Sequence, residues 1–169
     1  HLMTMMYGLL QQGQWTDQRQ DNLLDGGAHF YGTFECADGK WIAIGSIEPQ
    51  FYQLLLDTLG IDAQSKGVGQ AKKDWQKMRQ RLKQIFLREP QSHWCELMEG
   101  TDICFAPVLT MADAPAHPHN EARGTFVNAF GITQPGPAPR FSRTQGGIQR
   151  PPPIPGEHTA EVLKDWGVK

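Results

Sequence analysis

The sequence is poor in cysteine, which limits both the redox chemistry and the metal chemistry that it could support. Its 169 residues include three cysteines, Cys36, Cys95 and Cys104, and no two of them form a C-x-x-C pair. An odd number at wide spacings argues against a disulfide framework and against a zinc site. Each of the three lies in an apolar pattern, which is typical of a reduced, buried thiol that packs as a small hydrophobe.

The sequence also lacks an excess of charge and a long apolar run. Its 16 Lys and Arg residues face 18 Asp and Glu residues, for a net charge of −2 and no basic stripe. Nucleic-acid binding therefore has little electrostatic support. No run approaches the roughly 20 apolar residues that a membrane-spanning helix needs, and nothing resembles a secretory signal. The composition predicts a cytoplasmic protein with no nucleic-acid and no membrane partner.

Sequence motifs for bound cofactors and metals are missing as well. There is no G-x-G-x-x-G and no P-loop, and the pair Gly26-Gly27 is explained by turn geometry. His117 and His119 form an H-x-H pair, but no further ligand candidates stand at metal-site spacing. The sequence therefore predicts no metal site and no resident cofactor.

The most informative stretch predicts a β-hairpin that leads directly into a helix. Residues 30–36 and 41–46 are short runs rich in aromatic and β-branched residues, and Asp38-Gly39 between them is a strong hairpin signal. A helix is expected from Pro49 to Gly60, since proline suits the first helical position and glycine the end. Its apolar residues recur at helical spacing and are Phe51, Leu54, Leu55 and Leu59.

Glu48 stands between the second strand and this helix. The free backbone N–H groups at a helix start, together with the positive end of the helix dipole, favour a negative charge there. One explanation is structural, namely that Glu48 caps the helix, although Glu is not among the strongest N-cap residues. The other is functional, namely that the helix start holds a carboxylate for chemistry. The residue pattern alone leaves both explanations open.

The remaining sequence alternates helical patterns with short strand patterns. The Pro-rich region after residue 133 is typical of an extended connector. The predicted fold class is α+β, a small domain with an antiparallel hairpin-based sheet packed by helices and flanked by linker segments and terminal helices. We expect further helices over 1–12, 72–86, 91–99 and 159–166, short helical turns over 111–122, and strands over 102–109 and 125–132.

Three segments resemble a known enzyme family, in order and over essentially the whole chain. They are LLDGGAHFYGTFECADGKWIAIGSIEPQFY, APVLTMADAPAHPHNEARGTF and PAPRFSRT. The sequence resembles the family III CoA-transferases (CaiB/BaiF), specifically the α-methylacyl-CoA racemase branch, and it resembles only the C-terminal half. The resemblance implies three regions: residues 1–24 as the end of a large-domain helix with its linker, 25–132 as the small α+β domain, and 133–169 as a return linker with a C-terminal helix.

The resemblance also implies a function and a set of site residues. The racemase branch epimerises 2-methylacyl-CoA thioesters by exchange of the α-proton, as part of fatty acid metabolism, with acyl-CoA as substrate and no separate cofactor. Glu48 matches the glutamate of the family motif and is the predicted catalytic residue, as the carboxylate that orients the family's catalytic histidine. Tyr31 and Ile47 match positions near the acyl group and are the predicted substrate-binding residues.

The family's histidine and aspartate pair, and most of its CoA contacts, belong to the N-terminal half. The resemblance therefore implies that this chain is inactive alone, and that the complete enzyme is an interlocked homodimer. Two alternatives stay open at this point. One is a fragment of a family III CoA-transferase, and the other is a stand-alone module, without catalysis, for interaction or dimerisation.

Overall fold

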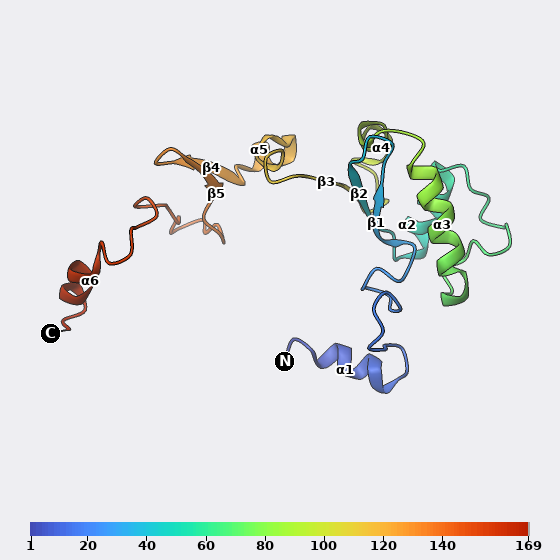
Figure 1. The fold of residues 1–169 in the computed structure, drawn as a ribbon, viewed down its shortest axis with the longest axis horizontal. Coiled ribbons are helices and arrows are strands. Elements are labelled where there is room, and N and C mark those ends of the chain that lie inside the picture. The colour runs from blue at the N-terminus through green and yellow to red at the C-terminus, as the bar shows by residue number, and fades with distance from the viewer. Residues whose placement is uncertain (169) are drawn as a thin grey trace. The chain divides into compact units, whose positions relative to one another are not determined.

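The computed structural model describes residues 1–168, which form two compact units (Figure 1). The first unit is His1–Val108, and the second begins at Leu109. Helices and small antiparallel sheets occur in the same chain, so the predicted α+β class is confirmed. The three functional regions predicted at 1–24, 25–132 and 133–169 remain a prediction.

A three-stranded antiparallel sheet is the centre of the first unit. Its strands are β1 (Tyr31–Glu35), β2 (Trp41–Gly45) and β3 (Phe105–Val108), in the order β1-β2-β3. The predicted hairpin joins β1 to β2, and Gly39 in its turn has a φ of 75°, which glycine adopts without strain. Pro107 lies on the edge strand β3, as its missing N–H requires.

Three helices in the first unit contribute the core side chains opposite the sheet. They are α2 (Pro49–Thr58), α3 (Trp75–Phe86), which follows the 3-10 turn η1 (Lys72–Asp74), and α4 (Gln91–Met98) (Figure 1). Each full burial of such a side chain stabilises the fold by about 1.5–3 kcal/mol. The buried core comprises Phe34, Ile42 and Ile44 of the sheet, Tyr52, Leu55 and Leu56 of α2, Met78, Leu82 and Phe86 of α3, and Trp94 and Met98 of α4.

The buried face of α2 differs from the predicted one. Tyr52, Leu55 and Leu56 are buried, whereas Leu54 is 37% exposed. Apolar residues occur on more than one side of this helix, so helical spacing alone could not decide which side faces the sheet. The hydroxyl of Tyr52 is satisfied internally, because it donates to the carbonyl of Val68 at 2.6 Å.

Helix α1 (Thr4–Gln11) contributes no buried residue. Leu2, Met3, Met5 and Tyr7 are each more than half exposed. A helix with apolar residues on most of its faces is normally covered by neighbours. The expectation that α1 continues a large-domain helix fits this exposure and stays a prediction.

The second unit contains short elements and a second, two-stranded sheet. The strand predicted over 125–132 is present only over Phe126–Ala129, because the chain then turns at Phe130-Gly131, where both residues have positive φ angles of 55° and 78°. The resulting hairpin pairs Phe126 with Pro135. The elements of this unit are η2 (Ala114–Ala116), α5 (Pro118–Arg123), β4 (Phe126–Ala129), β5 (Ile132–Pro135) and α6 (Thr159–Asp165).

Two classes of feature are missing from the described part of the chain. Among residues 1–168, no helix combines the length and the apolar character needed to cross a membrane. The same residues contain no group of three or more His, Cys, Asp or Glu side chains arranged to hold a metal ion.

His29 is a fully buried histidine that the sequence did not single out. Its Nε2 atom lies 2.8 Å from the hydroxyl of Tyr52. Since that hydroxyl donates to Val68, it accepts from Nε2–H, which leaves Nδ1 as a buried acceptor without a hydrogen-bond partner. Burial, reinforced by the charge of Arg79, lowers the pKa of His29 to about 4.

This histidine predicts a loss of stability in mild acid. The unfolded chain binds a proton near pH 6.5, whereas folded His29 binds it only near pH 4. The contribution of neutral His29 to the free energy of unfolding is thus complete above pH 6.5 and is lost as the pH falls through 4. The loss amounts to about 2–3 kcal/mol. Urea unfolding between pH 7 and pH 4 measures this decline. His29→Phe should flatten it, and an unchanged slope in that variant would assign the decline to other groups.

Candidate functional site

Glu48 occupies the junction between β2 and α2 and is exposed to solvent. It is the N-cap residue of α2, with extended backbone angles of φ −69° and ψ 139°. Its backbone carbonyl accepts the first helical hydrogen bond, from the N–H of Tyr52 at 3.0 Å. Its side chain makes no capping hydrogen bond. The structural explanation for a glutamate here is therefore weakened, because the carboxylate does not cap the helix.

The predicted substrate-binding residues lie beside this junction. Tyr31 pairs with Gly45 in the sheet, and a Cβ placed on Gly45 would lie 3.8 Å from the Tyr31 ring and 3.8 Å from Cys104 Cβ. The N–H of Ile47 donates to the carbonyl of Gly45 at 2.8 Å. Tyr31 and Ile47 are both half-buried and packed against the core. We call Tyr31, Gly45, Ile47, Glu48 and Cys104 the junction site.

The backbone of the junction is anchored from a segment far along the chain. The buried hydroxyl of Ser46 donates to the carbonyl of Ile103 at 2.6 Å. The N–H of Gly45 donates to the carbonyl of Cys104 at 2.9 Å. These contacts extend the β2–β3 pairing past the end of the strands, so Cys104 is held next to the residues that precede Glu48.

Cys104 corrects the sequence-based expectation of three buried thiols. Cys36 is buried and Cys95 is partly buried, but Cys104 is exposed. Desolvation raises the pKa of its thiol, and the charges of Glu48 and Asp102 raise it further. A thiol so shifted is mostly protonated at neutral pH and is a poor nucleophile. The backbone of Cys104 is hydrogen-bonded to Gly45, three residues before Glu48, so the thiol and the carboxylate belong to neighbouring segments.

Alkylation of Cys104 should report on this proximity. Glu48→Gln removes the negative charge, lowers the pKa of the thiol and raises the thiolate fraction. We expect iodoacetamide to modify Cys104 roughly two to three times faster at pH 8 in this variant, as judged by peptide mass spectrometry. Glu35→Gln, which changes a carboxylate that does not act on Cys104, should leave the rate unaltered. Equal rates in both variants would place the Glu48 charge away from the thiol.

The junction site offers few groups for acid–base chemistry. Its ionisable groups are the exposed carboxylate of Glu48, the thiol of Cys104 and the phenol of Tyr31. Moving a proton from one face of a carbon to the other requires an acid–base group on each face. The junction site can therefore supply an electrostatic or orienting carboxylate, and the acid–base groups on the two faces must come from other residues.

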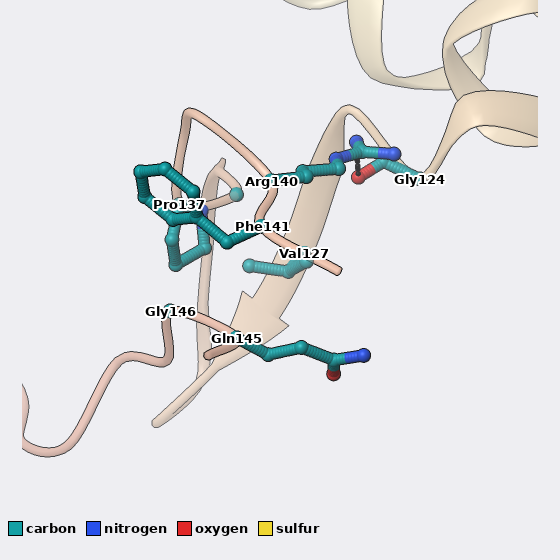
Figure 2. Close-up of a pocket in the computed structure, with 8 residues that line it drawn as sticks. Gly124, Val127, Pro137, Arg140, Phe141, Gln145 and Gly146 are labelled. Carbon is teal, nitrogen blue, oxygen red and sulfur yellow. Dashed lines mark hydrogen bonds between the residues drawn. The ribbon is translucent and has the colours of Figure 1, made fainter. Parts of the chain in front are cut away.

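A separate hollow in the second unit lacks such chemistry. This hollow has a volume of about 280 Å³. The guanidinium of Arg140 donates to the carbonyl of Gly124 at 2.9 Å, a hydrogen bond drawn as a dashed line in Figure 2. Arg140 is the only ionisable side chain among its lining residues in the described structure. The hollow contains no acid–base pair, and none of the predicted site residues lines it. Its lining residues are Gly124, Val127, Gly136, Pro137, Arg140, Phe141, Gln145 and Gly146.

The sequence predicts Glu48, Tyr31 and Ile47 as site residues, and this assignment stays a prediction. It does not single out Cys104 as a neighbour of the junction or Ser46 as its anchor, because both depend on pairing between segments 57 residues apart. A weak signal was available, because the predicted strand over 102–109 contains Cys104 and could pair with the hairpin. The partner strand could not be deduced from the pattern alone.

Comparisons with known proteins agree with one another. The sequence pattern of CoA-transferase family III matches residues 1–159. An alpha-methylacyl-CoA racemase of Mus musculus is 39% identical over 170 residues, which cover 99% of this chain and 44% of that protein. A succinyl-CoA:glutarate CoA-transferase of Homo sapiens is 33% identical over 89 residues, covering 50% of this chain and 20% of that protein.

The fold is similar to that of a solved relative. A CAIB/BAIF family protein from Brucella suis superposes with a TM-score of 0.63 at 19% sequence identity, over 97% of this chain and 44% of that one. At this identity the likeness concerns the fold alone. The chain thus spans a little under half the length of the relatives that match nearly all of it.

Proposed function

This chain belongs to CoA-transferase family III, and from that premise we propose that it forms the C-terminal part of an α-methylacyl-CoA racemase. The proposed reaction removes the proton from the carbon next to the thioester carbonyl of a 2-methylacyl-CoA and returns it to either face. The extent of the matches supports this choice, because the racemase resembles almost the whole chain and the transferase resembles half.

The observation that carries the proposal is the free carboxylate of Glu48. It is exposed, makes no capping bond, and stands beside Tyr31 and Ile47 at one end of the sheet. In the racemase branch the two proton-transferring groups are a histidine and an aspartate of the N-terminal half. We assign to Glu48 the role of accepting a hydrogen bond from that histidine, which fixes the ring and stabilises its protonated form.

Tyr31 and Ile47 are proposed to contact the acyl chain. Both present half-buried side chains next to the junction, and neither carries a charge. An apolar wall beside the reacting carbon excludes water and strengthens the electrostatic effect of Glu48. Acyl-CoA is the substrate in this proposal, and no separate cofactor takes part.

The proposal includes an interlocked homodimer in the cytoplasm that serves fatty acid metabolism. One supporting observation is the sheet face opposite the core, where Trp41 pairs with Val108. The Trp41 and Val108 side chains are 43% and 44% exposed, so this face of the sheet presents apolar surface to water. Cover from another part of the complete protein would remove this apolar surface from water.

The test is α-proton exchange by the full-length protein that contains this chain. Incubated with a 2-methylacyl-CoA in deuterated water, it should incorporate deuterium at the α-carbon without forming a new thioester. Transfer of CoA to an added carboxylic acid, with no exchange, would establish the transferase alternative instead. The chain of 169 residues assayed alone should show no exchange, and turnover by it would contradict the need for further residues.

A further inference from the structure

Gln70 lies 22 residues after Glu48 in the sequence, yet its side chain contacts the backbone that leads into Glu48. Its Nε2 group donates to the carbonyl of Ile47 at 2.8 Å and to the carbonyl of Ser46 at 3.3 Å. The side chain of Gln70 is partly buried. One amide group therefore binds both of the carbonyls that directly precede Glu48.

These carbonyls lie in a gap between two hydrogen-bonding systems. Strand β2 ends at Gly45, and α2 begins at Pro49, which has no N–H to donate. The helical hydrogen bonds begin only at the carbonyl of Glu48. Backbone carbonyls withdrawn from water need a donor, and here a side chain supplies it. At the junction the Gln70 side chain thus supplies the hydrogen-bond donors that a neighbouring strand supplies to the carbonyls within the sheet.

Gln70 is itself held in place by its neighbours. Its backbone carbonyl accepts from the indole N–H of Trp75, the first residue of α3, at 2.9 Å. Two residues earlier, the carbonyl of Val68 accepts from the hydroxyl of Tyr52 in α2. The loop around Gln70 is therefore attached to both helices, and the amide can act as a fixed support rather than a mobile one.

We propose that Gln70 is a positioning residue for Glu48, because its amide fixes the Ser46 and Ile47 carbonyls and so the direction of the Glu48 carboxylate. The inference rests on the proposed role of Glu48. A carboxylate that orients a histidine must be held to within about 0.5 Å. A displacement of about 1 Å at such a site can lower a rate by roughly 100-fold. Losing the support without unfolding the junction should cost less than that.

The first arm of the experiment measures activity in the full-length protein. Gln70→Met removes both N–H donors and keeps the length of the side chain. We expect kcat for α-proton exchange to fall roughly 10-fold, with KM changed less than about 2-fold. Gln53→Met is the matched control, since the amide of Gln53 bonds Asp57 on the exposed face of α2 at 2.8 Å. This control should retain the activity of the unaltered protein.

The second arm asks whether Gln70 acts through Glu48. In a protein that already carries Glu48→Gln, adding Gln70→Met should lower the exchange rate by less than about 2-fold, because the group being positioned is gone. A general structural defect would instead reduce the rate by the same factor in both backgrounds. That result would overturn the proposed positioning role.

The third arm requires no activity and separates this inference from the proposed function. The N–H of Tyr52 is bonded to the carbonyl of Glu48, so a loosened junction should expose it. Hydrogen–deuterium exchange of the peptide 46–56 should be roughly 10-fold faster in Gln70→Met than in Gln53→Met. If the full-length protein shows no α-proton exchange at all, the proposed function fails, and this arm alone decides whether Gln70 fixes the junction. Unchanged hydrogen exchange would refute the inference.

Discussion

Glu48→Gln in the full-length protein is expected to lower the rate of α-proton exchange by about one to three orders of magnitude. The substitution keeps the shape of the side chain and removes its charge. A histidine that loses its carboxylate partner is less well oriented, and its protonated form is less stable. Deuterium incorporation into a 2-methylacyl-CoA, followed by mass spectrometry, measures the effect.

The pH dependence distinguishes an orienting role from a structural one. A nearby carboxylate raises the pKa of a histidine, because it favours the charged ring. Removing the carboxylate should therefore move the limb of the pH–rate profile that reports the histidine to lower pH. Thermal stability should change by less than about 0.5 kcal/mol, since the Glu48 side chain makes no capping bond.

A matched control is available on another helix of the first unit. Glu96 is an exposed carboxylate on α4, and Glu96→Gln should leave both the exchange rate and its pH profile unchanged. If Glu48→Gln exchanges protons as fast as the unaltered protein, Glu48 has no part in the mechanism. If instead the loss of rate follows a loss of stability, the residue serves the fold.

The second large effect is a loss of stability that we expect from a substitution in the hydrophobic core. Phe86→Ala should destabilise the first unit by about 3–5 kcal/mol, because it combines lost burial with a cavity that the neighbours fill poorly. The Phe86 ring is fully buried and lies 5.1 Å from the rings of Phe34 and Trp94, measured between centroids. The indole of Trp94 also donates to the Phe86 carbonyl at 3.0 Å. One substitution thus weakens contacts to β1 and α4 together.

Urea unfolding followed by tryptophan fluorescence measures this loss. The expected cost is a large part of the roughly 5–15 kcal/mol that a domain typically has. Phe86→Leu, which removes less volume, should fall between the alanine variant and the unaltered chain and remains measurable if the alanine variant does not fold. Gln84→Ala, on the exposed face of the same helix, should cost less than about 0.5 kcal/mol. A cost for Phe86→Ala as small as that would mean that this ring is not central to the core.

Local sequence signals predicted the local structure well. Asp38-Gly39 placed the hairpin turn, and Pro49 placed the start of α2, because each of these residues restricts the backbone directly. The prediction failed where the pattern was ambiguous. The apolar run over 125–132 hid a turn at Phe130-Gly131, and the apolar residues of α2 did not define a single face.

The candidate site likewise has features that local sequence signals predict and features that they do not. Glu48 could be placed at a helix start from the sequence, since the end of a strand pattern and a proline surround it. Whether the carboxylate caps that helix depends on side-chain geometry, which residue types leave open. The neighbours Cys104 and Gln70 were not predictable as parts of the site, because they arrive through contacts between distant segments.

By itself the sequence determined the hairpin, the helix that follows it, the family and a glutamate between strand and helix. These follow from backbone preferences and motifs that act within a few residues. Only the tertiary structure decided that the glutamate side chain is exposed and does not cap α2. It also decided that Cys104 packs beside Gly45, and that a distant amide holds the backbone leading into Glu48. Such features depend on which strands pair and which loops pack, and the free energy that selects them is spread over the whole core rather than encoded at any one position.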